Sequence, residues 1–295
     1  MRIKFKYIFL VLSSIMAIAC GGNLSQKPVV TVSLQPQKYF LEKIVGDKIE
    51  VKCLLASGGN PETYEPSLTH LLNLENSKAY FMIGHLGFET AIIERVKNNN
   101  PDLKIYNNSE GIDLLMGTHG GCSHHNHASG HHSHRHDIDP HTWSSVRNAR
   151  IIAKNMCDAM IEIDKKNAQY YTENYKHFIS ELDSLDARLM SMLAPKKGTA
   201  FLVWHPSLSY FARDYGLSQI SVGQEGKETS VQQLQAKIDE AKAHSANVFF
   251  YQKEFDNRQA EVVNGQIGAE MVIINPLNYQ WNHEMLIIAD AIASK

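Results

Sequence analysis

Short apolar runs alternate with amphipathic stretches along most of this chain. Runs rich in β-branched and aromatic residues have the length and composition of buried strands, and stretches with helical spacing lie between them. The strand candidates are 29–32, 49–54, 79–83 and 103–106 in the first half, and 200–204, 218–222, 247–251 and 271–274 in the second half. Four strands followed by four more, with helices between, predict an α/β fold with two lobes, each a four-stranded parallel-type sheet flanked by helices.

A long amphipathic stretch separates the two sets of strands. Apolar residues recur there at alternating steps of four and three and form one stripe: Tyr171, Tyr175, Phe178, Leu182, Leu185, Leu189 and Met192. Asp164 can cap this helix and Pro195 ends it. At 1.5 Å per residue, 165–193 would extend about 43 Å, as a rigid strut that limits hinge motion. We therefore predict an amino-terminal lobe over 28–160, a connecting helix over 164–193 and a carboxy-terminal lobe over 197–295.

Composition narrows the function classes. The chain has 295 residues, of which 43% are hydrophobic and 20% charged, as expected for two globular domains. A net charge of -2 provides no basic field for nucleic acid or for an anionic membrane surface, so we expect no nucleic-acid partner. Four cysteines are too few for a disulfide scaffold. Whether Cys53, Cys122 and Cys157 form one disulfide stays open.

The amino terminus has the features of an export signal. Basic residues precede an apolar run over 7–19 that is too short to span a bilayer, and Ala19-Cys20-Gly21 follows it. This resembles a bacterial lipoprotein signal over 1–20, with Cys20 as the lipidated residue; an ordinary secretory signal with an incidental cysteine is the alternative. No later run is long enough for a membrane span. We expect an exported, periplasmic or cell-surface monomer, held to a bacterial membrane only by its lipid anchor.

A histidine-rich tract lies within a loop over 117–138. Imidazole is the commonest side-chain ligand for zinc, copper and nickel, so the tract predicts auxiliary metal capture. Glycine and serine between the histidines favour a flexible loop, and a merely solvated polar loop is the alternative interpretation. The histidines are His119, His124, His125, His127, His131, His132, His134 and His136.

Side chains of the types that bind ligands or metal ions also follow several of the predicted strands. In open α/β sheets, ligands bind beyond the carboxyl ends of the strands. The segments 61–66, 139–143, 204–206 and 275–278 occupy such positions, two in each lobe. Taken singly, His141 and His205 can be capping or packing residues. If the lobes face each other, the four segments converge on one cleft, and metal ligation becomes the stronger hypothesis.

Three motifs resemble the zinc and manganese solute-binding proteins of bacterial ABC transporters, the ZnuA/TroA-like family. Pro-Glu-Thr-Tyr-Glu-Pro at 61–66 is similar to the family's Pro-His-x-Tyr-Glu-Pro, and Asp-Pro-His-Thr-Trp at 139–143 to its Asp-Pro-His-x-Trp. The segment 205–217 looks like its His-Pro…Tyr-Phe-x-x-Tyr-Gly-Leu. The resemblance covers essentially the whole mature chain. It implies two lobes bridged by a rigid helix, one metal between them and delivery to a membrane permease.

Two departures from the family pattern affect the metal site. Glu62 replaces the family's first histidine, and the late carboxylate has no clear match, because Asn275 and Asn278 occupy that region. Glu62, His141 and His205 would still form a ligand set that suits zinc, and the carboxylate makes the site more tolerant of manganese or iron. The fourth position is open among water, Glu225, Glu254 and the region of Asn275.

The resulting hypothesis is an extracytoplasmic receptor that collects zinc on the loop, holds it in the cleft and delivers it to an ABC permease. Affinity should fall as the pH drops through the histidine range, because only neutral imidazoles bind metal. A manganese or iron receptor of the same class and an exported metal buffer or adhesin are the alternatives. A zinc hydrolase is a third, since two histidines, one glutamate and a water form a catalytic arrangement. We find no partnered nucleophile or general-base motif, so we expect no enzyme.

Overall fold

Two four-stranded parallel sheets form the frame of the molecule, which we describe from a computed structural model for residues 27–117, 138–223, 230–252 and 258–295. The first sheet has the order β2-β1-β3-β4 and the second the order β6-β5-β7-β8, so both lobes share one topology. All pairings within the two sheets are parallel. The strands are β1 (Val29–Val32), β2 (Glu50–Cys53), β3 (Ala79–Met82), β4 (Lys104–Asn107), β5 (Ala200–Val203), β6 (Ser218–Ser221), β7 (Val248–Gln252) and β8 (Glu270–Ile274).

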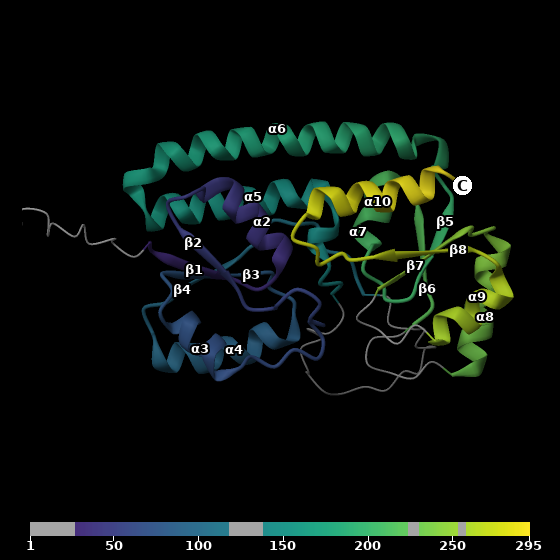
Figure 1. The fold of residues 1–295 in the computed structure, drawn as a ribbon, viewed down its shortest axis with the longest axis horizontal. Helices are drawn as coiled ribbons and strands as arrows, with labels where there is room; N and C mark the ends of the chain where they lie inside the picture. Colours follow the sequence, from purple (N-terminus) through teal and green to yellow (C-terminus); the bar gives the residue numbers. More distant parts are fainter. Residues whose placement is uncertain (1–26, 118–137, 224–229, 253–257) are drawn as a thin grey trace, which may run out of the picture.

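Helices cover both faces of each sheet (Figure 1). In the amino-terminal lobe, α2 and α5 lie on the face toward the long helix α6, and α3 and α4 lie on the opposite face. In the carboxy-terminal lobe, α7 and α10 lie on the side toward α6, and α8 and α9 pack together on the other side. The helices are α2 (Gln35–Val45), α3 (Leu68–Glu75), α4 (Gly87–Asn99), α5 (Val146–Ile163), α6 (Ala168–Leu193), α7 (Ser209–Tyr215), α8 (Val231–Ala243), α9 (Arg258–Ile267) and α10 (Trp281–Ala293).

These observations confirm the predicted fold class. Each predicted strand is present within one or two residues of its expected ends. The central strands β1, β3, β5 and β7 are the most deeply buried, as expected for apolar runs in parallel sheets with helices on both faces.

The connecting helix differs from its prediction at the amino-terminal end. Residues Lys165–Asn167 form a 3₁₀ turn, and α6 begins only at Ala168. Asp164 makes no capping hydrogen bond, because its carboxylate accepts hydrogen bonds from Tyr171 Oη and Asn167 Nδ2 instead. The expected apolar stripe is present, although Tyr175 and Met192 are only partly buried. Through this stripe α6 packs against α2, α5 and α10 and so spans both lobes.

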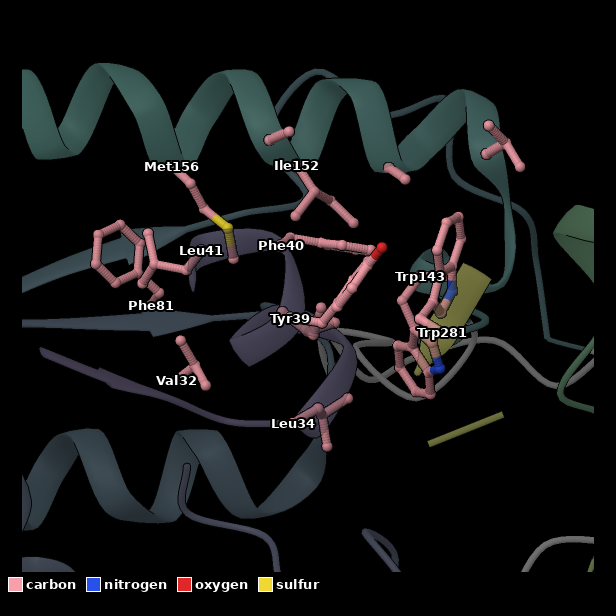
Figure 2. Packing of buried hydrophobic residues seen from close by; sticks show 14 of the residues in the cluster. Val32, Leu34, Tyr39, Phe40, Leu41, Phe81, Trp143, Ile152, Met156 and Trp281 are labelled. Carbon is pink, nitrogen blue, oxygen red and sulfur yellow. The ribbon is translucent and has the colours of Figure 1, made fainter. Parts of the chain in front are cut away.

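One continuous core joins the amino-terminal lobe to α6 and to α10. Figure 2 shows Ile152 and Met156 of α5 directed toward α2, with Trp143 and Trp281 lying next to each other at one end of the cluster. The rings of Phe40 and Trp281 meet edge to face with 4.9 Å between centroids, although they come from opposite halves of the chain. The lobes therefore share a packed aromatic contact behind the segments that follow the strands.

Several sequence predictions fall outside the described residues: the signal over 1–20 with Cys20, the histidines of 119–136, Cys122, Glu225 and Glu254. Among the described residues, no helix has both the length and the hydropathy that crossing a bilayer requires. Cys53 and Cys157, both described, are free thiols.

Candidate metal site

All four segments identified beyond the strands line one small cavity between the lobes. Pro61 comes from the segment after β2, His141 from the segment before α5, His205 from the segment after β5, and Asn275 from the segment after β8. Parallel strands bring their carboxyl ends to the same edge of a sheet, so segments distant in sequence meet where the two edges face each other. The predicted convergence is therefore present.

A short stem positions the segment that carries His141. Met116 and Ile138 pair in an isolated antiparallel bridge, so the chain leaves and re-enters the amino-terminal lobe at the same place. The Asp139 amide donates to the Leu115 carbonyl oxygen at 2.9 Å, and Tyr210 Oη of α7 donates to the Asp139 carbonyl oxygen at 2.8 Å. The segment is thus held by both lobes.

His141 is buried and oriented by Asp139. Oδ1 of Asp139 accepts hydrogen bonds from the His141 backbone amide at 2.9 Å and from Nδ1 at 2.7 Å. Burial acts to raise the pKa of Asp139, but the contacts with His141 outweigh it and hold that pKa below its usual value. An ionised Asp139 keeps the proton on Nδ1 and leaves the Nε2 lone pair available as a metal ligand.

His205 meets His141 across the cavity. The two Nε2 atoms lie 3.0 Å apart, and the rings are nearly perpendicular. Burial lowers the pKa of His205 well below its usual value, and the nearby His141 lowers it further. His205 is therefore neutral over the physiological range, as ligation requires.

The separation of the two Nε2 atoms suits a shared cation. A tetrahedral zinc about 2.0–2.1 Å from each nitrogen would place the two nitrogens roughly 3.3 Å apart. With each proton on Nδ1, the two Nε2 lone pairs face each other, and a cation between them would turn this repulsion into attraction. The pair needs only a small expansion to accept such an ion.

Glu62 lies beside His205 but does not complete a three-residue cluster. Its Oε1 is 3.1 Å from Nδ1 of His205, the nitrogen that does not face His141. Among the described residues, no three His, Cys, Asp or Glu side chains are grouped so that they could hold one ion. The structure thus brings Glu62, His141 and His205 together without directing all three at a single point.

Other cavity residues were missed from the sequence. Ser207 and Gln252 line the cavity, and Gln252 Nε2 donates to Ser207 Oγ at 2.9 Å. Gln252 is the last residue of β7, so the rule that ligands bind beyond strand ends could have identified it.

Asn275, which lies in the region considered for the fourth ligand, forms hydrogen bonds with residues of its own loop and of α10. Its side-chain Oδ1 accepts a hydrogen bond from the Leu277 backbone amide at 3.1 Å, and its backbone amide donates to Glu284 Oε1 at 2.6 Å. The buried Glu284 of α10 therefore shapes this wall of the cavity, a role that its place beside His283 in the sequence did not indicate.

Comparisons with known proteins agree with this architecture. Residues 30–285 match the family model described as "Zinc-uptake complex component A periplasmic". The chain is 27% identical to the high-affinity zinc uptake system protein ZnuA of Bacillus subtilis, over 93% of this chain and 89% of that protein. A crystal structure of ZnuA is similar with a TM-score of 0.81 and 34% identity, covering 91% of this chain and 98% of that one. The manganese complex of FpvC from Pseudomonas aeruginosa shares the fold, with a TM-score of 0.75 and 22% identity, covering 91% and 98%.

Proposed function

This chain belongs to the ZnuA family of zinc-uptake components, and on that premise we propose that it is an extracytoplasmic receptor that captures zinc and delivers it to an ABC permease. The observation that carries the proposal is the histidine pair His141 and His205, whose Nε2 atoms face each other at 3.0 Å in the cavity between the lobes. Members of this family are solute-binding receptors, and we propose no catalytic role for this chain.

Zinc is the proposed cargo because the described cavity offers imidazole nitrogen at its centre. Zinc binds nitrogen and sulfur ligands readily, whereas manganese favours carboxylate, carbonyl and water oxygen. The sequence similarity to a zinc-uptake protein supports zinc, and the manganese-bound structural neighbour makes manganese the alternative cargo.

Three further elements of the proposal concern residues outside those described. Export by the 1–20 signal and lipid attachment at Cys20 would hold a monomeric receptor at the membrane that contains its permease. The histidines of 119–136 would collect zinc loosely and pass it to the cavity. The pairing of the flanking residue Met116 with Ile138, which lies three positions before His141 in the sequence, supports this.

Zinc titration of single-alanine variants tests the ligand assignment. We expect protein purified without chelator to contain zinc, as measured by elemental analysis. His141→Ala and His205→Ala should each lose more than about 100-fold in affinity, beyond the roughly 10–100-fold typical of outer-sphere partners. Competition with a chromophoric chelator gives the affinities, and a variant without residues 118–137 should lose only weaker, additional sites.

His177→Ala is the matched control, because His177 is an exposed histidine of α6 far from the cavity in sequence. It should bind zinc like the parent. Parent-like affinity in both His141→Ala and His205→Ala would show that the metal binds elsewhere.

A further inference from the structure

We propose that Glu62 is a positioning residue that orients His205 through Nδ1, and that it does not bind the cation directly. This inference rests on the proposed function and defines how the site selects its cargo. It departs from the ligand role that the sequence alone assigned to Glu62.

The geometry around His205 separates its two nitrogens by role. Nε2 faces the Nε2 of His141, so this is the nitrogen on the cavity side. Oε1 of Glu62 contacts the other nitrogen, Nδ1, at 3.1 Å. The Glu62 side chain is 25% exposed, whereas that of His205 is 7% exposed, so the carboxylate lies on the more solvent-exposed side of this contact. An imidazole that binds a metal through one nitrogen commonly has a carboxylate at the other.

Each histidine thus has a carboxylate beside Nδ1, hydrogen-bonded at His141 and at ion-pair distance at His205. Asp139 contacts Nδ1 of His141 at 2.7 Å, and Glu62 contacts Nδ1 of His205 at 3.1 Å. Both carboxylates favour a proton on Nδ1, and both leave Nε2 as the metal-facing atom. Asp139 acts within its own segment, whereas Glu62 reaches from the amino-terminal lobe to a histidine of the carboxy-terminal lobe.

Local hydrogen bonds stabilise the segment that carries Glu62. The Glu62 amide donates to Asn60 Oδ1 at 2.8 Å, and Tyr64 Oη donates to the Leu54 carbonyl oxygen at 2.9 Å. The first bond anchors the backbone at Glu62, and the second anchors the side chain of Tyr64 two residues later.

Cargo selectivity follows from this placement. If Glu62 lies outside the coordination sphere, His141 and His205 are the titratable residues that line the described cavity, and they offer only imidazole nitrogen to the ion. The hydroxyl and amide side chains in the lining are uncharged: Asn60, Ser207, Gln252 and Asn275. A nitrogen-centred site favours zinc over manganese. Replacing the family's histidine by glutamate at position 62 then need not make the site harder.

Two substitutions of Glu62 test the assignment. Glu62→Gln keeps an oxygen that can accept from Nδ1, and Glu62→Leu removes it. We expect Glu62→Leu to lower the affinity for zinc and for manganese by the same factor, about 10–100-fold, and Glu62→Gln to restore most of the loss. Glu65→Gln, an exposed glutamate of the same segment, is the control and should leave both affinities unchanged.

A measurement on the metal-free protein separates positioning from ligation. In ¹⁵N spectra of the histidine rings, His205 should carry its proton on Nδ1 in the parent and become a tautomer mixture in Glu62→Leu. An unchanged His205 tautomer, or a loss of manganese affinity much larger than that of zinc, would overturn the proposal and return Glu62 to the ligand set. A parent protein that binds neither metal would defeat the proposed function instead, since the tautomer result does not depend on metal.

Discussion

At the residue scale, His205 determines how the site responds to protons. Burial holds its pKa well below the usual value, so the folded protein keeps this imidazole neutral. A histidine with a depressed pKa stabilises the folded state above its unfolded pKa of about 6.5. That contribution is lost as the pH falls, because the unfolded chain takes up the proton first.

We therefore expect the unfolding free energy of metal-free parent protein to fall relative to that of His205→Gln between pH 7.5 and 5.5, by at most about 1.4 kcal/mol per pH unit. Urea denaturation in the presence of chelator measures this difference. His177→Gln removes one exposed histidine and is the control. A difference independent of pH would mean that His205 titrates alike in both states.

The residue scale is also where sequence reasoning was least complete. His141 and His205 were identified because each follows a strand and lies in a recognisable motif. The contact of Glu62 with Nδ1, the hydrogen bond from Gln252 to Ser207 and the role of Glu284 depend on side-chain directions between distant segments. No spacing in one sequence reports such directions, so ligand and positioning carboxylates look alike there.

At the element scale, the stripe on α6 is the feature that holds the two lobes to one scaffold. Leu189 is fully buried in this stripe, and its neighbour Met190 is 57% exposed. Leu189→Ala should lower the unfolding free energy by about 2–5 kcal/mol, because it leaves a cavity where α6 meets the core. Met190→Ala should change it by less than about 0.5 kcal/mol. Chemical denaturation of both variants measures the contrast, and equal costs would place the α6 interface elsewhere.

The helices and strands could be predicted from the sequence where the local pattern of apolar residues determines them. The strands and the α6 stripe follow from apolar periodicity, which the packed core preserves. The start of α6 was not predictable, because the carboxylate of Asp164 can make either of two local interactions. It could have capped a helix, and in the structure it accepts a hydrogen bond from Tyr171 Oη, seven residues later on α6.

At the scale of the whole molecule, hydrogen bonds between the lobes add to the connection made by α6. Trp143 Nε1 donates to the Pro276 carbonyl oxygen at 3.0 Å, and Trp281 Nε1 donates to the Trp143 carbonyl oxygen at 2.8 Å. Both indoles are buried, so breaking either bond would leave a polar group without water. Trp143 is two residues from His141, so these bonds hold the lobes together directly behind the histidine pair.

Zinc binding should accordingly leave the separation of the lobes unchanged. Opening the cleft as a hinge would have to break the two indole hydrogen bonds, separate Phe40 from Trp281 and bend α6, whereas admitting zinc requires only a slight expansion of the histidine pair. Small-angle X-ray scattering of metal-free and zinc-loaded protein should give the same radius of gyration within error. A smaller radius in the loaded protein would show that the lobes close on the ion and that the contacts behind the cavity are not a fixed support.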